Sequence, residues 1–455
     1  MRSITLHDTQ TGAVRPLDPR DPGKVGIYAC GPTVYGRIHV GNARPYVVFS
    51  LLKRFLEHEG YAVNFVANVT DVNDKIYDAA RAAGVGSDEL AREMTAAYMA
   101  DTEALALGRP DHEPLATETM AEIVALIETL IERGHAYAVE GDVYFDVRSY
   151  PAYGELSHRD VDQMDQGEPD PDPARPALKR DPLDFALWKV QKEGEDTAWD
   201  SPWGRGRPGW HIECSAMAEK LLGVGFDIHG GGSDLVFPHH ENEAAQTAAA
   251  CGEPLARLWM HNGMVRLDGE KMAKSVGNIF LLHEAIAAQG RDALIAYFCA
   301  GHYRQPIAYS EERLEEAARS VARIREAGRR LVPGPSPEEL APLREQFFAA
   351  LAEDFNTPKA LATVFDWVRE ANRRDQPTGD ADLREMLGVF ALEHLLDADD
   401  AAGGPDDAAR ELLAQREAAR AARDFAAADR LRDELADLGW VVRDSADGPA
   451  LVPRG

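Results

Sequence analysis

The stretch Lys24-Val-Gly-Ile-Tyr-Ala-Cys-Gly-Pro-Thr-Val-Tyr-Gly36, followed closely by His39-Val-Gly-Asn42, decides the fold. Its first seven residues are mostly apolar, as is typical of a strand, and a turn rich in glycine and proline follows them. A helical pattern then continues to about Glu59, and residues 62–69 predict a second strand. Strand, turn, helix and strand form the βαβ unit of a doubly wound parallel sheet, in which ligands bind at the carboxyl ends of the strands.

Outward from this unit, the pattern divides the chain into segments. We interpret residues 115–203, with a helix at 118–134, a strand pair near 137–147 and an acidic, proline-rich loop, as an insertion into the sheet domain. Strand signals return at Phe226–His229 and Leu258–Val265, and the chain beyond them is mostly helical. Linkers are expected at 333–337 and 401–405. The sequence therefore predicts an α/β fold, a parallel sheet with an insertion followed by helical C-terminal domains.

Composition limits the class of protein. No apolar run reaches membrane-spanning length, and the N-terminus lacks the apolar stretch of a signal peptide, so we expect no membrane association. Four cysteines in 455 residues do not make a disulfide framework and indicate a reducing cytoplasm. Two of them, Cys251 and Cys299, are expected to be buried packing residues. The net charge of −28 argues against a generic nucleic-acid binder, although a local basic track can operate on an acidic body.

Four residues far apart in the sequence have the side chains of one metal site: Cys30, Cys214, His239 and Glu243. The last two are four residues apart, which places both on one face of a helix. Two thiolates, an imidazole and a carboxylate suit zinc better than calcium or magnesium. The alternative is that the cysteines are core residues and the other two form a surface pair, and spacing alone leaves this open.

Two short motifs carry the side chains of a nucleotide site. His39-Val-Gly-Asn42 lies at the start of the expected helix, where backbone N–H groups and the helix dipole favour an anion and Gly41 permits close approach. Lys271-Met-Ala-Lys-Ser275 places two ammonium groups in one loop, which suits a triphosphate. Taken singly, each motif has an ordinary alternative, a structural histidine at a helix start or a solvated surface loop.

Together the two motifs resemble the paired signatures of class I aminoacyl-tRNA synthetases. Four further segments narrow the resemblance to the cysteinyl-tRNA synthetase family, and it extends over essentially the whole chain. These segments are Tyr28-Ala-Cys-Gly-Pro-Thr-Val-Tyr35, Asn68-Val-Thr-Asp71, Pro208-Gly-Trp-His-Ile-Glu-Cys-Ser-Ala-Met217 and Asp227-Ile-His-Gly-Gly-Gly-Ser-Asp-Leu-Val-Phe-Pro-His-His-Glu-Asn-Glu243. The domains that the resemblance implies are a Rossmann-like catalytic domain (1–114 and 204–280), a connective insertion (115–203), a stem-contact and lysine-loop region (281–333), a helical bundle (334–400) and an anticodon-binding domain (405–455).

The resemblance also assigns roles to single residues. It implies that one zinc ion per chain is held by Cys30, Cys214, His239 and Glu243, and that the adjacent His240 is not a ligand. The residues implied around the ATP phosphates are His39, Asn42, Lys271 and Lys274. Those implied to lie close to the adenylate are Gly41, His229, Gly230, Gly231 and Gly232. Those implied around the bound amino acid are Thr70, Trp210 and Asp234.

The implied reaction is the ligation of L-cysteine to tRNA(Cys), with ATP and Mg²⁺, by a cytoplasmic monomer. The cysteine carboxylate would attack the α-phosphate of ATP, and the adenylate would then pass to the 2′-hydroxyl of the terminal ribose of the tRNA. Serine has almost the same shape as cysteine, and a contact worth one methylene discriminates only ~10–200-fold. A thiol, with a pKa of about 8.5, is readily deprotonated on a metal. We therefore expect the substrate thiolate to coordinate the zinc directly, and expect no editing domain.

Two positions depart from the family pattern. Asn42 stands where the general class I signature has histidine, and its amide donates a hydrogen bond but carries no charge. Ala273 replaces the first serine of the usual Lys-Met-Ser-Lys-Ser loop, which removes one hydroxyl contact and leaves both lysines. We expect neither change to abolish catalysis.

The terminal unit is where rival functions differ. We expect its arginines to fall on one helical stripe near Phe425 and Trp440, and the resemblance makes this unit the anticodon reader; a solvated face is the ordinary alternative. The arginines are Arg416, Arg420, Arg423 and Arg430. The rivals are a ligase that joins activated cysteine to an aminosugar, which has no anticodon to read, and an inactive zinc- and RNA-binding paralogue. A zinc hydrolase is disfavoured because the His-Glu-x-x-His spacing is absent.

Overall fold

The computed structural model describes residues 2–164, 178–267, 270–271, 280–397, 407–422, 424–438, 440–445 and 448–453. For Glu270 and Lys271 it describes the backbone alone. The chain divides into two compact units, Met1–Leu395 and Leu396–Gly455, and each is described by itself.

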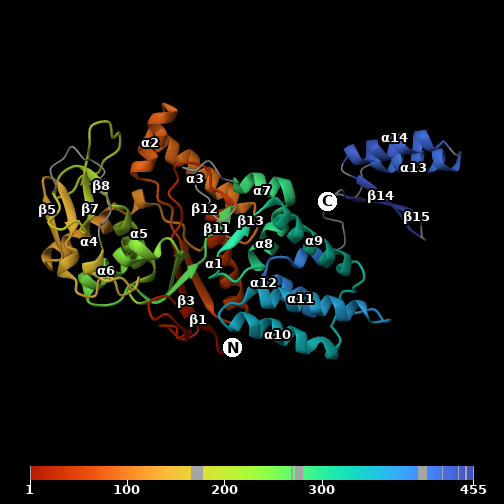
Figure 1. The fold of residues 1–455 in the computed structure, drawn as a ribbon, viewed down its shortest axis with the longest axis horizontal. Coiled ribbons are helices and arrows are strands. Elements are labelled where there is room, and N and C mark those ends of the chain that lie inside the picture. Colours follow the sequence, from red (N-terminus) through yellow and green to blue (C-terminus); the bar gives the residue numbers. More distant parts are fainter. Residues whose placement is uncertain are drawn as a thin grey trace. The chain divides into compact units, whose positions relative to one another are not determined.

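A parallel sheet of four strands lies at the centre of the first unit (Figure 1). In spatial order the strands are β10 (Ala256–Asn262), β9 (Phe226–Gly232), β3 (Lys24–Ala29) and β4 (Ala62–Ala67). Every neighbouring pair is parallel, and Ile27 of β3 lies opposite Phe65 of β4 and Ile228 of β9. The α/β fold class is confirmed, because two segments of the chain about 200 residues apart build one sheet, as a doubly wound domain with an insertion requires.

Helices cover the sheet and position its carboxyl edge. Helix α1 (Val40–His58) connects β3 to β4 and packs against β9, and the sequence predicts all four of these elements. Helix α5 (Trp210–Leu222) packs against β3. Tyr28, Val66 and Phe226, from three of the strands, share one core cluster with Met217 and Leu222 of α5. Helix α6 (Glu241–Cys251) precedes β10 and packs on α5. The helices α2 (Asp74–Ala83) and α3 (Ser87–Glu103) follow β4.

The insertion contains its own antiparallel sheet and lies at the left of Figure 1. Its elements are α4 (Met120–Glu132), β5 (Ala136–Val139), β6 (Asp142–Phe145), β7 (Phe185–Val190) and β8 (Gly206–Pro208). The predicted helix and strand pair are confirmed as α4 and β5–β6. Strands β7 and β8 were not predicted, and β8 runs past the expected boundary at 203 to join α5 directly. Ile127, Phe145, Phe185 and Trp188 form its core together with residues of α5 and α6.

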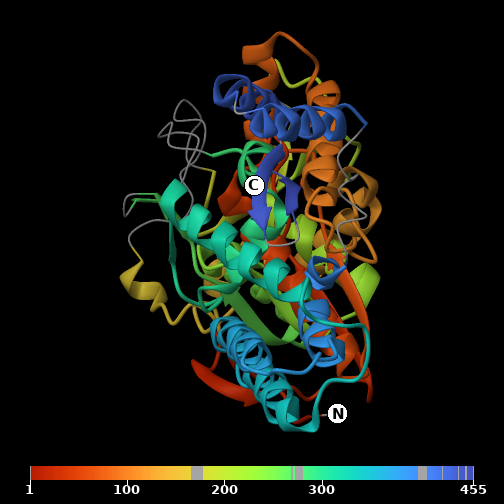
Figure 2. The ribbon, with the colours of Figure 1, turned by 90° about the vertical axis from the view of Figure 1, so that its right-hand side faces the viewer.

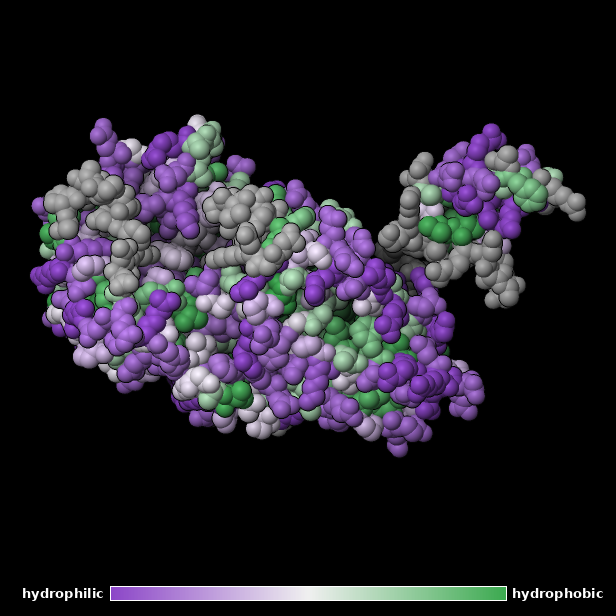
Figure 3. All heavy atoms as spheres, in the orientation of Figure 1, coloured by the Kyte–Doolittle hydropathy of each residue, from purple (hydrophilic) through white to green (hydrophobic). Residues whose placement is uncertain are grey.

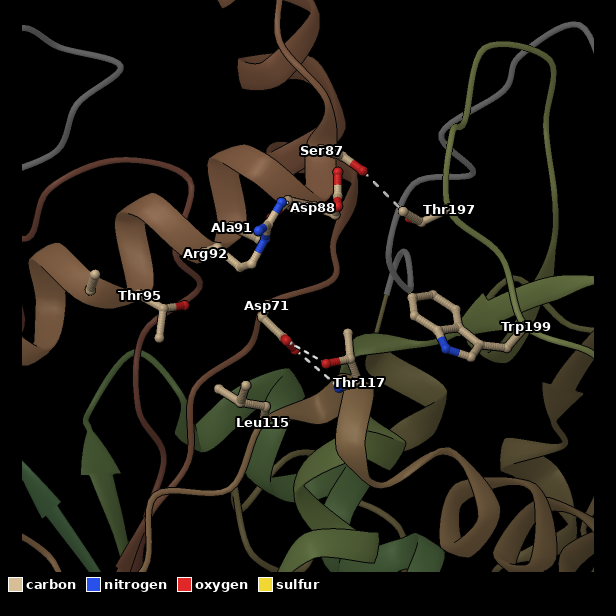
Figure 4. Close-up of a pocket in the computed structure, with 11 residues that line it drawn as sticks. Asp71, Ser87, Asp88, Ala91, Arg92, Thr95, Leu115, Thr117, Thr197 and Trp199 are labelled. Carbon is tan, nitrogen blue, oxygen red and sulfur yellow. Dashed lines mark hydrogen bonds and ion pairs between the residues drawn. The ribbon is translucent and has the colours of Figure 1, made fainter.

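Hydrogen bonds fasten the insertion to the sheet domain (Figure 4). The backbone N–H and the hydroxyl of Thr117 donate to the two oxygens of Asp71, at 3.0 and 2.5 Å. On α3, the N–H and hydroxyl of Ser87 donate to Asp196 of the insertion, at 2.8 and 2.5 Å. Between these two contacts lies a cavity of about 530 Å³, walled by Trp199. The insertion and the sheet domain are therefore joined by a pair of hydrogen bonds on each side of this cavity.

One predicted strand, Leu258–Val265, is wrong as a single element. Strand β10 ends at Asn262, and β11 (Val265–Leu267) belongs to a separate sheet with β12 (Glu270–Lys271) and β13 (Ile307–Tyr309). Gly263 and Met264 make the turn between β10 and β11. The prediction joined the apolar residues on both sides of His261-Asn-Gly263 into one strand, although the Asn-Gly pair within it is a turn signal.

The helices beyond residue 281 form the other side of the first unit (Figures 1 and 2). They are α7 (Leu282–Gln289), α8 (Arg291–Cys299), α9 (Glu311–Gly328), α10 (Ala341–Ala352), α11 (Thr357–Asn372) and α12 (Ala381–Val389). The first strands, β1 (Thr5–Asp8) and β2 (Ala13–Pro16), form a hairpin. The His7 N–H donates to Asp354 at 2.9 Å, and Arg2 pairs with Glu345 on α10 at 2.6 Å. The chain start is thus tied to the helical part, which lies about 350 residues away in sequence.

The second unit consists of two helices and a hairpin. These are α13 (Asp407–Ala421), α14 (Phe425–Asp437), β14 (Trp440–Ser445) and β15 (Gly448–Pro453). The predicted pair of helices is confirmed, but the predicted single arginine stripe is wrong. Arg416 and Arg420 lie on α13 and Arg430 on α14, while Arg423 is outside the described residues. Arg416 is buried and pairs with Glu417.

Hydrophilic side chains cover most of the described surface on the face drawn in Figure 3. Within the described residues, no helix combines the length and apolar character that crossing a membrane requires. Cys299 is buried as predicted, whereas the prediction for Cys251 is wrong, because Cys251 is exposed in the last turn of α6.

Candidate active site

The His39-Val-Gly-Asn42 motif forms the N-terminal cap of α1. The Asn42 N–H donates to Nδ1 of His39 at 3.2 Å, and the His39 N–H donates to Oδ1 of Asn42 at 3.3 Å. This reciprocal pair is a capping box. Because Nδ1 of His39 accepts a hydrogen bond, the proton of the neutral ring lies on Nε2. The cap thereby leaves Nε2 as the donor nitrogen of the His39 ring. Because Oδ1 of Asn42 accepts within the cap, the side-chain amide nitrogen of Asn42 is the group that the cap does not use.

Glycines near this edge allow other groups to approach closely. A Cβ atom at residue 41 would lie 2.9 Å from the His39 ring, so a larger residue there would disturb the cap. In β9, a Cβ atom at residue 230 would lie 2.0 Å from the Phe49 ring of α1. Close packing against Phe49 therefore requires glycine at position 230. This requirement is independent of the role near the adenylate that the sequence predicts for Gly230 and Gly231.

A cavity of about 560 Å³ opens between the start of α1 and the carboxyl edge of the sheet. It brings together predicted residues from distant parts of the chain. Those that line it are Cys30, His39, Gly41, Asn42, Trp210, Gly232 and Asp234. Gly263 and Met264, which follow β10, also line it. One cavity is thus bordered both by a predicted metal ligand and by the helix start suited to phosphate.

The four predicted metal ligands lie together next to this cavity, which Cys30 lines. Their donor atoms all lie within 4.8 Å of one another, and all four side chains are buried. Nε2 of His239 is 3.0 Å from Oε1 of Glu243, and Sγ of Cys30 is 3.5 Å from each of those two atoms. His239 lies in a short π-helical turn (Val236–His240) that leads into α6, so the expected regular helix begins only after it. Buried sulfur, nitrogen and oxygen donors in one cluster fit a zinc ion.

A second layer of side chains orients these donors. Nδ1 of His211 lies 2.8 Å from Nδ1 of His239, which leaves Nε2 of His239 directed at the cluster. Nε2 of His229 lies 2.7 Å from Oε2 of Glu243. Trp210 stacks on the His239 ring, with centroids 4.1 Å apart. Such outer partners fix the tautomer and orientation of ligands in metal sites.

The cluster shifts the pKa values of its own members. The hydrogen bond with Cys30 lowers the pKa of the Cys214 thiol to about 6, and burial raises the pKa of Cys30 well above its usual range. Burial opposes the charged form of His239, but Glu243 and Cys214 raise its pKa to about 10. Burial likewise opposes the charge on Glu243, yet His229 and His239 hold its pKa well below the usual range. These shifts favour the metal-binding forms of Cys214 and Glu243, whereas Cys30 and His239 would each have to lose a proton to bind a metal.

His240 belongs to a second possible donor group, Cys30, His229, His240 and Glu243, whose atoms also lie within 4.8 Å of one another. Nδ1 of His240 lies 2.7 Å from Nε2 of His261, and its own Nε2 is buried without a hydrogen-bond partner among the described residues. The two groups share Cys30 and Glu243; the first adds Cys214 and His239, and the second adds His229 and His240. That His239 rather than His240 is the ligand stays a prediction.

Comparison with known proteins bears on the whole chain. The family described as tRNA synthetases class I (C) catalytic domain matches residues 16–319, a DALR domain matches 346–392, and the cysteinyl-tRNA ligase anticodon binding domain matches 403–448. The cysteine–tRNA ligase of Alkalilimnicola ehrlichii is 46% identical over 462 residues, which cover 98% of each chain. That of Rubrobacter xylanophilus is 45% identical over 476 residues, covering 99% of this chain and all of the relative.

The chain belongs to the cysteine–tRNA ligase family. It is therefore an aminoacyl-tRNA synthetase, and the resemblance stated from the motifs is confirmed. The match to an anticodon binding domain and the full-length relatives favour this family over the aminosugar ligase and the zinc hydrolase.

Solved structures give the same fold at low sequence identity. The Mycobacterium tuberculosis methionyl-tRNA synthetase with methionyl-adenylate has a TM-score of 0.58 at 17% identity, covering 82% of this chain and 90% of that one. The Agrobacterium radiobacter LeuRS–tRNA–LeuAMS complex has a TM-score of 0.59 at 12% identity, with 84% of each chain covered. At these identities the likeness establishes the class I synthetase fold alone.

The remaining predicted residues of this synthetase lie at varying distances from the cavity. Thr70 is buried beside the lining and pairs through its backbone with Thr33. His229 is buried behind Glu243. Lys271 is described only through its backbone, which pairs with Arg266 in β11, and Lys274 lies outside the described residues. Beyond the lysine loop, the Leu282 N–H donates to the Ile38 carbonyl at 3.0 Å, so the chain returns to the start of α1.

Sequence reasoning missed several groups of the site. Lys75 and Tyr35 both line the cavity, with the ammonium 5.7 Å from the ring centroid. Glu213 is buried next to Cys214, and burial raises its pKa well above the usual range. The missed residues Tyr35, His211 and Glu213 all lie within the family segments quoted above, so the resemblance could have pointed to them. Lys75 lies in none of these segments.

The capping box generates a test that separates two roles of Asn42. Asn42→Asp keeps the oxygen that accepts from the His39 N–H but loses the amide donor. We expect it to leave the free energy of unfolding near the wild-type value and to lower the rate of ATP–pyrophosphate exchange by ~10²–10³. Asn42→Ala loses both groups, and should also lower the free energy of unfolding by about 0.5–2 kcal/mol. Wild-type exchange by Asn42→Asp would show that the side chain serves only as a cap.

Proposed function

We propose that this enzyme activates L-cysteine with ATP, transfers it to the 3′-terminal ribose of tRNA(Cys), and selects cysteine through a zinc ion. The observation that carries the proposal is that Cys30, a member of the buried donor cluster, lines the same cavity as His39, Gly41 and Asn42. An amino acid whose side chain lies at the cluster and a nucleotide whose phosphates lie at α1 would meet in that cavity.

The nucleotide side of the cavity would stabilise charge on the phosphates. The Nε2–H of His39 and the amide of Asn42 would be donors at the positive end of the α1 dipole. Lys271 and Lys274, whose side chains lie outside the described residues, would hold the β- and γ-phosphates together with substrate-bound Mg²⁺. No protein nucleophile is needed, since positioning and charge stabilisation supply the catalysis.

The amino-acid side would orient cysteine for attack. The Asp234 carboxylate, exposed at the cavity wall, suits the substrate ammonium; Trp210 lines the same cavity, and Thr70 is buried beside it. A carboxylate oxygen of cysteine would attack the α-phosphorus, the O–P bond would form, and pyrophosphate would leave. The tRNA hydroxyl would then attack the carbonyl carbon of the adenylate and release AMP.

Zinc would be held by Cys30, Cys214, His239 and Glu243, whose buried donors fit it. When bound, it supplies a Lewis acid that prefers the sulfur of cysteine to the oxygen of serine. His211 and His229 would keep the rings and carboxylate in place, as their bonds to His239 and Glu243 support.

The terminal unit, residues 405–455 in our proposal, would read the anticodon. Phe425 is 64% exposed, and Arg430 is exposed on the same helix, so α14 offers an aromatic ring and a guanidinium to an unstacked base. Trp440 begins the hairpin that follows. Arg416 is less suited to this role, because it is buried and paired.

The metal assignment predicts zinc content. The purified wild-type chain should hold one zinc ion, measured by atomic emission, and Cys214→Ser should bind it at least ~10-fold more weakly. Cys251→Ser, at an exposed cysteine outside the cluster, is the matched control and should keep its zinc. Full zinc retention in Cys214→Ser would instead favour the donor group that contains His229 and His240.

Selectivity is the second expected property. The ratio of kcat/KM for cysteine over serine in ATP–pyrophosphate exchange should exceed the ~10–200-fold that shape alone gives. The physical reason is that the thiol becomes an anion on a metal far more easily than the alcohol does. A ratio inside that range, in the zinc-loaded enzyme, would contradict metal-based selection.

Removal of residues 405–455 tests the terminal unit. Charging of tRNA(Cys) should fall ~10-fold or more, since stacking contributes about 1–3 kcal/mol per base. Exchange with cysteine should stay close to wild type, because the cavity lies wholly within the first unit. Equal losses in the two assays would contradict an anticodon role.

A further inference from the structure

Arg44 is a buried cation in the second turn of α1. Its side chain is 1% exposed, and it is among the largest fully buried side chains. No carboxylate of the described part of the chain forms an ion pair with it, and its Nε has no hydrogen-bond partner there. Burial lowers the pKa of Arg44 to about 10, so it remains charged at neutral pH. A buried charge without an ion-pair partner lowers the stability of the fold, so its presence calls for a reason.

The guanidinium joins three backbone carbonyls. Nη1 donates to the carbonyl of Gly263 at 2.5 Å and to that of Met264 at 3.3 Å, and Nη2 donates to the carbonyl of His302 at 3.1 Å. Gly263 and Met264 form the turn between β10 and β11, and His302 precedes β13, which pairs with β11. Arg44 therefore links α1 to the two segments that precede β11 and β13, which pair with each other.

These carbonyls do not need Arg44 to be satisfied. The Gly263 carbonyl also accepts from Nδ2 of Asn262 at 3.1 Å, that of Met264 from the Ile307 N–H at 3.0 Å, and that of His302 from the Gln305 N–H at 2.9 Å. Replacing Arg44 with an apolar residue would leave none of them without a partner. What would be lost is the rigid connection among them, since a planar guanidinium holds several acceptors in a fixed arrangement.

The connection joins two segments that both line the proposed nucleotide cavity. His39 and Asn42, two to five residues before Arg44, line it, and so do Gly263 and Met264, whose carbonyls Arg44 binds. The turn has little freedom on its other side, because a Cβ atom at residue 263 would lie 2.4 Å from the Gln305 backbone. Beyond the turn, β11 leads directly toward the lysine loop.

We propose that Arg44 is a positioning residue that fixes the His39–Asn42 wall of the cavity against the Gly263–Met264 wall. This inference rests on the proposed function, because it assigns Arg44 to the adenylation step. Arg44 touches neither ATP nor cysteine; it acts through the backbone of both walls. A displacement of about 1 Å between groups that hold the reacting atoms lowers a rate by as much as ~10²-fold.

The test uses Arg44→Met, which keeps the length of the side chain and removes the charge and the donors. We expect its midpoint of thermal unfolding to match or exceed that of wild type, since an unpaired buried cation is removed. In ATP–pyrophosphate exchange, kcat should fall ~10–10²-fold. The KM for cysteine and the zinc content should stay at wild-type values, because the donor cluster does not contact Arg44.

Arg54→Met is the matched control. Arg54 lies on the same helix and donates from Nε and Nη2 to the Gly388 carbonyl, at 2.9 and 2.6 Å, on the side facing α12. It should change stability without changing kcat. A fall in kcat for Arg44→Met that is matched by Arg54→Met would indicate a general structural effect and overturn the inference.

A folded Arg44→Met with wild-type kcat would also overturn it. If Arg44→Met does not fold, Arg44→Lys decides, because it keeps the charge but offers one ammonium in place of the planar fork. Reduced kcat in folded Arg44→Lys supports positioning, and wild-type kcat overturns it. Absence of exchange in the wild-type enzyme would contradict the proposed function instead, since both variants are measured against it.

Discussion

The parallel pairing of β3 with β9 is the contact on which the site depends. Three backbone positions of each strand meet, from Ile27 with Ile228 to Ala29 with Gly230, and the Cys30 N–H donates to the Gly230 carbonyl at 3.0 Å. This register sets Cys30 at the end of one strand beside the residues that follow the other. From there the chain turns into His239 and Glu243. A shift by one residue would turn Cys30 toward the other face of the sheet and separate it from both.

Helix α5 connects this pairing to the insertion. It follows β8 with Gly209 between them, where a Cβ atom would lie 1.9 Å from the Ala186 carbonyl oxygen. Ile212 packs into the core of the insertion, while Met217 packs into the core of the sheet domain. Trp210 and Cys214 lie on the same helix, so the packing of both cores determines where these two side chains stand. The insertion therefore supports the site even though its own residues do not carry the chemistry.

Much of the fold was predictable because its signals are local. The βαβ unit, α4 and the terminal helices follow from periodicity and from glycine and proline. The donor cluster was predictable for a different reason: Cys30, Cys214, His239 and Glu243 combine compatible ligand chemistry with a family pattern. The change of sheet at Gly263 was missed even though Asn262-Gly263 is a turn signal, because apolar residues stand on both sides of it. The contacts of Lys75 and Arg44 had no local signal, because each is made with a part of the chain distant in sequence.

The position of β9 also has a consequence for synthesis on the ribosome. Between Ile27 and its partner Ile228 lie about 200 residues, which at ~5–20 residues per second take roughly ten to forty seconds to translate. Throughout that interval the nascent β3 lacks one of its two neighbours and leaves an unpaired apolar edge. The early chain is thus a natural client for a chaperone, and the donor cluster cannot assemble around a metal until more than half of the polypeptide has emerged.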